Sequence, residues 1–100
     1  MTSGILTFIE QRDGKIKAPS FEALGEALRL KAAVGGDVSA VVVGANVKGL
    51  ADAIAARGAD RVYVVDQGYL ATFDAAAYGR AVERAAAEAK PALVLVPGTA

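Results

Sequence analysis

The chain has 100 residues, in which 11 Lys and Arg balance 11 Asp and Glu, and it contains no Cys and no His. This length suits one domain, and the missing residue types exclude disulfides, thiolate chemistry and a histidine general base or metal ligand. The charge forms no basic stripe and no apolar run approaches the ~20 residues of a membrane helix, so we expect no nucleic-acid partner, no membrane insertion and a cytoplasmic protein.

The first predicted strand is residues 5–9, a run rich in β-forming residues. An Asp13-Gly14 turn follows, and we predict that residues 15–17 pair back after it as a short antiparallel flap. The first helix opens at Pro19 with Ser20 as its N-cap, carries an apolar stripe at helical spacing and ends at residues 35–36, which are both Gly.

Two further strand–helix units follow the first. The second strand is residues 38–43; its turn ends in Asn46, which we expect to cap a helix that buries Val47, Leu50 and Ile54. The third strand is residues 62–65. We expect Asp74 to cap the third helix, whose predicted inner face is Tyr78, Val82, Ala85 and Ala89.

The fourth predicted strand, residues 92–96, contains no polar residue. A strand that is apolar on both faces belongs in a sheet covered by helices on both sides, so we expect residues 1–100 to be the front domain of a longer chain. The exposed edge of this strand is expected to cause self-association.

The order β-α-β-α-β-α-β predicts an α/β fold with an open, doubly wound parallel sheet in the strand order 3-2-1-4. Ligands of such sheets bind at the carboxyl ends of the strands, where the winding reverses. The residues that border this switch point are predicted to be Glu10, Gln11, Gly98 and Thr99.

Other candidate sites have simpler structural explanations. The loop from Gly44 to Gly49 has the glycine spacing of a phosphate loop, but Leu50 and Ala51 follow where the motif needs Lys and Ser or Thr. The remaining candidates are loop or turn residues that we expect to be structural: Asp60, Asp66, Asp74, Tyr69 and Phe73. No catalytic pair or metal cluster is complete, so the residues indicate a domain that is not an enzyme by itself.

Several segments resemble the alpha subunit of electron transfer flavoproteins in order and spacing. They are residues 5–16 (ILTFIEQRDGKI), 20–24 (SFEAL), 41–44 (VVVG), 58–64 (GADRVYV) and 91–100 (PALVLVPGTA). The resemblance implies an adenine-nucleotide-hydrolase-like, Rossmann-like N-terminal domain that acts as a scaffold. It also implies a beta-subunit partner, dehydrogenase electron donors and a membrane or quinone-linked acceptor. FAD would be held mainly by a C-terminal domain outside these residues, so no FAD ligand is assigned here.

A free-standing nucleotide-binding domain of the universal stress protein type is the alternative. It would need a glycine-rich phosphate loop after the fourth strand. A pyrophosphatase-type enzyme is less favoured, because Glu10-Gln11-Arg12 stands where that class has a glycine-rich loop.

Overall fold

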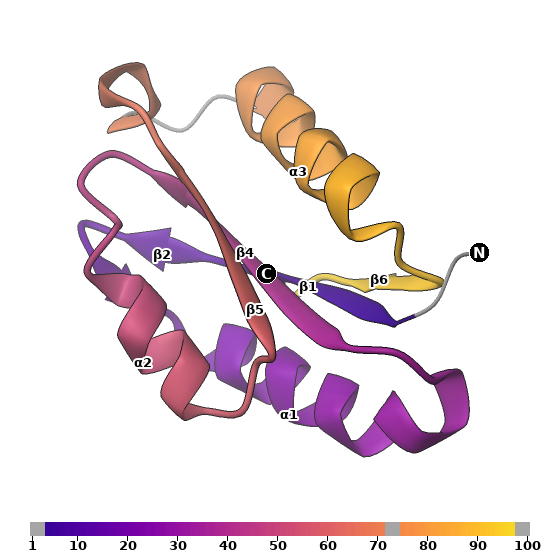
Figure 1. The fold of residues 1–100 in the computed structure, drawn as a ribbon. Helices are drawn as coiled ribbons and strands as arrows, with labels where there is room; N and C mark the ends of the chain where they lie inside the picture. Colours follow the sequence, from indigo (N-terminus) through magenta and orange to yellow (C-terminus); the bar gives the residue numbers. More distant parts are fainter. Residues whose placement is uncertain (1–3, 72–74, 98–100) are drawn as a thin grey trace.

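A computed structural model describes residues 4–71 and 75–97 and contains a sheet of four parallel strands (Figure 1). The strands lie in the order β5 (Arg61–Asp66), β4 (Val38–Gly44), β1 (Ile5–Ile9) and β6 (Leu93–Leu95). Counted along the chain, this is the order 3-2-1-4. The α/β class and the parallel sheet are therefore confirmed. Strand β6 is shorter than predicted, and among the described strands it pairs with β1 alone.

Helices cover both faces of the sheet. Helices α1 (Ala18–Val34) and α2 (Leu50–Ala56) lie on one face, and α3 (Ala75–Ala89) lies on the other (Figure 1). Alternate strand residues point to opposite faces, so Ile5, Ile9 and Val42 join the α1–α2 core while Leu6, Val41 and Val43 join the α3 core. No described helix is long and apolar enough to cross a bilayer.

The predicted flap is present beyond the carboxyl end of β1. Strands β2 (Gln11–Arg12) and β3 (Lys15–Ile16) pair antiparallel. Asp13 and Gly14 connect them with φ angles of 53° and 79°. Positive φ at both central residues is the backbone of a tight hairpin turn, which the Asp-Gly pair favours.

Two predicted helix caps are wrong. Helix α1 begins at Ala18 after Lys17, and the buried Ser20 lies inside its first turn, where its hydroxyl binds the backbone of Glu10. Helix α2 begins only at Leu50, and Gly49 stands at its N-cap without a side-chain hydrogen bond. Asn46 instead takes a left-handed conformation, with φ 59°, in the turn before the helix.

Helix α3 packs on the sheet through small residues. Its buried positions are Ala77, Ala81 and Ala85, spaced four apart, while Tyr78 and Val82 are half-buried beside them. Two of the four predicted inner residues, Tyr78 and Val82, therefore flank the buried row, whereas Ala85 lies in it as predicted. A row of alanines lets the helix approach the strands closely. The predicted cap, Asp74, lies outside the described residues.

Candidate functional site

The carboxyl ends of β1 and β4 and the segment after β5 surround a hollow of about 300 Å³. The β2–β3 hairpin, the β4–α2 loop and the 3-10 helix η1 (Gly68–Ala71) supply its walls. Its lining residues are Gln11, Asp13, Gly14, Ala45, Asn46 and Leu70. This is the edge of the sheet at which ligands of doubly wound folds bind, so it is the candidate site.

Gln11 joins the hairpin to the end of β4. Its side-chain nitrogen donates a hydrogen bond of 3.1 Å to the carbonyl of Val43, and its side-chain oxygen accepts one of 3.0 Å from the N–H of Gly14. Gly44 gives the amide room, because a Cβ atom at this position would collide with Gln11 Nε2. The side chain of Gln11 is thus occupied in holding the walls of the hollow together.

Glu10 is fixed through its backbone. Its N–H donates a hydrogen bond of 2.7 Å to Ser20 Oγ, and the Ser20 hydroxyl donates one of 3.3 Å to its carbonyl. The Glu10 carboxylate lies 3.7 Å from Lys17 Nζ and does not line the hollow. The other two residues predicted to border the switch point, Gly98 and Thr99, lie outside the described part of the chain.

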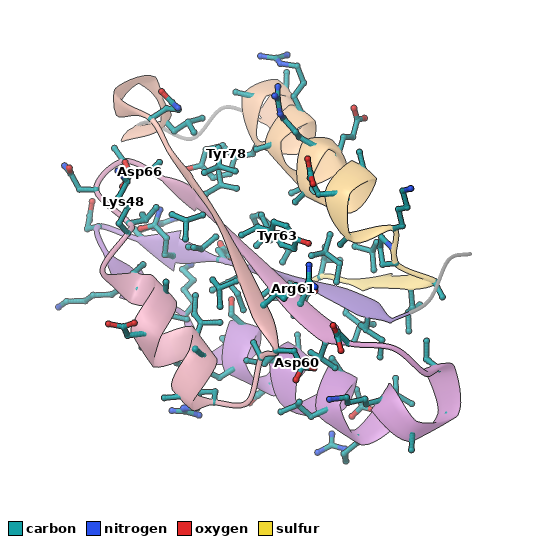
Figure 2. The ribbon with its side chains drawn as sticks, viewed as in Figure 1. Lys48, Asp60, Arg61, Tyr63, Asp66 and Tyr78 are labelled. Atoms are coloured by element: carbon teal, nitrogen blue, oxygen red, sulfur yellow. The ribbon has the colours of Figure 1, made fainter. Side chains whose placement is uncertain are left out.

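Asp66 closes the β4–α2 loop from the end of β5. Its carboxylate accepts hydrogen bonds from the consecutive backbone N–H groups of Asn46, Val47 and Lys48, at 2.8, 2.9 and 3.2 Å. These bonds, led by that from Asn46, lower the pKa of Asp66 below its ordinary value. Successive N–H groups that converge in this way form an anion-binding nest. Here the anion is a carboxylate of the chain itself (Figure 2).

The loop from Gly44 to Gly49 therefore has no open place for a phosphate at these three N–H groups. The hollow beside it is lined by Asp13 and by no Lys or Arg. An adenine dinucleotide needs positive or N–H groups for its pyrophosphate, so the described residues of this edge do not fit one.

Asp60 serves the opposite end of β5 (Figure 2). Its carboxylate accepts hydrogen bonds from Lys31 Nζ at 2.9 Å and from the N–H of Val38 at 2.8 Å. The bond from Lys31 is the main cause of a lowered pKa at Asp60. Asp60 thus connects the end of α1 to the starts of two strands, a structural role.

The other sequence candidates add no chemistry to the described site. Phe73, Asp74 and the side chain of Tyr69 lie outside what the structure describes. Within residues 4–71 and 75–97, no group of three or more Asp and Glu side chains could hold a metal ion.

Sequence reasoning placed Asp66 at a strand end but missed that it closes the loop at Asn46. The signal for this pairing is weak, because an acid after a strand and a short turn after the neighbouring strand are each common. Only the adjacency of β4 and β5 brings Gly44 and Asp66 opposite one another.

Comparison with known proteins gives consistent matches over almost the whole chain. The electron transfer flavoprotein domain matches residues 5–100. The electron transfer flavoprotein subunit alpha of Thermoanaerobacterium thermosaccharolyticum is 40% identical over 95 residues, which cover 95% of this chain and 29% of that protein. The subunit alpha of Megasphaera elsdenii is 38% identical over 96 residues, covering 96% and 28%.

A relative with another name matches the same length. Lactate dehydrogenase (NAD(+),ferredoxin) subunit LctC of Acetobacterium woodii is 32% identical over 96 residues, covering 96% of this chain and 23% of that protein. The chain thus spans less than a third of the length of these curated relatives.

Proposed function

The chain belongs to the electron transfer flavoprotein domain family, and on this premise we propose that it is the N-terminal scaffold domain of an electron transfer flavoprotein alpha subunit. The observation that carries the proposal is the match to alpha subunits at 38–40% identity over 95–96 residues. The proposal places residues 1–100 at the front of a longer chain, in the cytoplasm.

In this proposal the complete subunit pairs with a beta subunit and carries FAD. The pair takes electrons from dehydrogenases and passes them to a membrane or quinone-linked acceptor, so it is an electron carrier rather than a catalyst. The similarity to a subunit that is named as part of a lactate dehydrogenase supports an association with dehydrogenases.

The proposal also assigns FAD to a part of the protein outside this chain. When bound, FAD accepts and donates the electrons. The described carboxyl edge does not fit its pyrophosphate, because the N–H groups of Asn46, Val47 and Lys48 already bind the Asp66 carboxylate. The poor fit between this edge and the FAD pyrophosphate supports a scaffold role for the domain.

The polar groups at the candidate site support the same role, because they fix loops to the sheet. Ser20 holds the start of α1 against the end of β1, and Gln11 holds the hairpin against β4. A rigid sheet with fixed loops suits a domain that positions other domains. The alternative, a free-standing nucleotide-binding domain, is not favoured by the family match.

The test is the visible absorption spectrum of the full-length protein purified with its partner. We expect a flavin spectrum that bleaches on reduction. Gln11→Ala should lower the thermal midpoint of the complex while leaving the flavin content unchanged.

A colourless protein that releases AMP or ATP on denaturation would refute the electron-carrier proposal. If the wild-type protein contains flavin, but the Gln11→Ala variant loses FAD without a change in thermal midpoint, the scaffold assignment alone would be refuted.

A further inference from the structure

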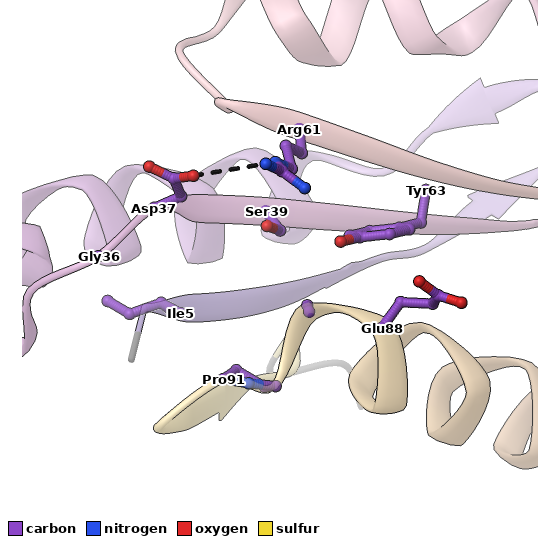
Figure 3. A pocket seen from close by; sticks show the side chains of 9 residues that line it. Ile5, Gly36, Asp37, Ser39, Arg61, Tyr63, Glu88 and Pro91 are labelled. Atoms are coloured by element: carbon purple, nitrogen blue, oxygen red, sulfur yellow. Dashed lines mark ion pairs between the residues drawn. The ribbon is translucent and has the colours of Figure 1, made fainter. Parts of the chain in front are cut away.

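A second hollow, of about 240 Å³, opens at the amino ends of the strands, far from the candidate site (Figure 3). It lies on the α3 side of the sheet, between the starts of β4 and β5 and the last turn of α3. Its polar lining consists of Asp37, Ser39, Arg61, Tyr63 and Glu88. We call this hollow the amino-end groove.

Ser39 forms part of the floor of the amino-end groove. The residue is only 5% exposed, yet no hydrogen bond of its hydroxyl is found among the residues that the structure describes. Because Ser39 lines the groove and its hydroxyl makes no hydrogen bond to the described residues, this group is available to a ligand that enters the groove.

Tyr63 and Glu88 approach the groove from two elements. Tyr63 extends from β5 and Glu88 from α3, and both side chains line the groove (Figure 3). Within the described ranges, the Glu88 carboxylate has no ion pair. An aromatic ring and an unpaired carboxylate that line the same groove are a combination that binds a planar cation.

The charge of the lining also favours a cation. Asp37 and Glu88 supply two negative charges and Arg61 supplies one positive charge, which leaves a net charge of −1. The Asp37–Arg61 pair is long, at 3.8 Å between Arg61 Nε and Asp37 Oδ2, and both side chains are mostly exposed. The Glu88 carboxylate is thus the strongest site for an entering positive charge.

We propose that the amino-end groove binds the guanidinium group of an arginine side chain presented by a partner polypeptide. The guanidinium would donate to the Glu88 carboxylate and to the Ser39 hydroxyl while it stacks on the Tyr63 ring. Arginine suits this lining better than lysine, because its planar fork carries five donors and stacks on aromatic faces. The proposal does not depend on the electron-carrier role.

The test is a titration of the isotope-labelled full-length protein with acetyl-Gly-Arg-Gly-amide, followed by NMR. We expect shifts of the backbone signals of Ser39, Tyr63 and Glu88. Acetyl-Gly-Gln-Gly-amide should cause no such shifts. Glu88→Gln should lower the affinity for the arginine peptide by about tenfold. Glu83→Gln changes an exposed α3 position outside the groove and should leave this affinity unchanged.

Three results would overturn the proposal. The first is an absence of shifts at Ser39 and Tyr63 with the arginine peptide. The second is an equal loss of binding in Glu88→Gln and Glu83→Gln, which would point to a general charge effect. The third is stronger binding of acetyl-Gly-Glu-Gly-amide, which would make Arg61 the main contact and the ligand an anion.

Discussion

The carboxylate of Asp66, at the end of β5, accepts a hydrogen bond of 2.9 Å from the backbone N–H of Val47, 19 positions earlier in the chain. The neighbouring N–H groups of Asn46 and Lys48 donate to the same carboxylate. One carboxylate therefore accepts hydrogen bonds from three consecutive N–H groups of the turn between β4 and α2. The conformation of this turn depends on a charged side chain at the end of the neighbouring strand.

This dependence predicts a change in acid stability on Asp66→Asn. The folded-state pKa of Asp66 lies below the ordinary value of 3.8, so its contribution is complete above that value and is lost as the pH falls through the folded pKa. We expect Asp66→Asn to lower the free energy of unfolding at neutral pH. The difference in this free energy between variant and wild type should become smaller as the pH falls below 3.8. Urea titrations at a series of pH values measure this difference.

The control for this prediction is Asp52→Asn, at an exposed position of α2. It should leave the pH dependence close to that of wild type. A gap between Asp66→Asn and wild type that stays constant down to the lowest pH would contradict the role assigned to the charge.

Ser20 is fully buried and binds both backbone groups of Glu10. Ser20→Ala leaves those groups without this partner, and we expect a loss of about 1–3 kcal/mol in the free energy of unfolding. The matched control is Ser39→Ala, at another residue that is mostly buried, whose hydroxyl makes no hydrogen bond among the described residues. Equal losses in the two variants, by chemical denaturation, would count against the assigned contact.

Gly44 lies under Gln11, and an added Cβ atom would also approach Val47 Cγ1 to 2.9 Å. We expect Gly44→Ala to cost about 1–3 kcal/mol through overpacking. Combining it with Gln11→Ala should recover only part of the loss, because Val47 remains in place. The comparison is Gly25→Ala in α1, where no atom lies within 4 Å of the added carbon. That variant should gain about 0.5–1 kcal/mol.

Thr7 is fully buried in β1, and its hydroxyl has no hydrogen-bond partner among the described residues. Thr7→Val keeps the shape of the side chain and removes the unsatisfied group. We expect it to stabilise the domain by about 1 kcal/mol. Destabilisation in the same unfolding assay would mean that the hydroxyl has a partner in solution.

Strand β6 offers an edge that pairs with no other described strand, and its neighbourhood carries two exposed valines, Val94 at 43% and Val96 at 65%. We expect the 100-residue chain to self-associate through this edge, as unpaired edges do. Val94→Lys should reduce the average mass measured by light scattering at high concentration. A wild-type chain that stays monomeric throughout would contradict this expectation.

Much of the fold follows from the sequence by itself. The apolar runs at residues 5–9 and 38–43 and the Asp13-Gly14 turn are local signals, and their strands and hairpin lie where these signals place them. The presence of the helices could also be predicted, because apolar periodicity and the glycine at residue 35 are signals that act within a few residues. The first residues of the helices could not be predicted as well, because Ser20 and Asn46 have side chains that can cap a helix but do not do so here.

The use of the polar residues was decided by the tertiary structure. Ser20 serves Glu10 rather than its own helix because the end of β1 lies beside the start of α1. Asp66 reaches Asn46 because β4 and β5 are neighbours. Glu88 and Tyr63 line the same groove because α3 crosses that face of the sheet. A sequence pattern carries the period of one element, whereas a hydrogen bond between distant residues needs the order of strands and the packing of helices to be known.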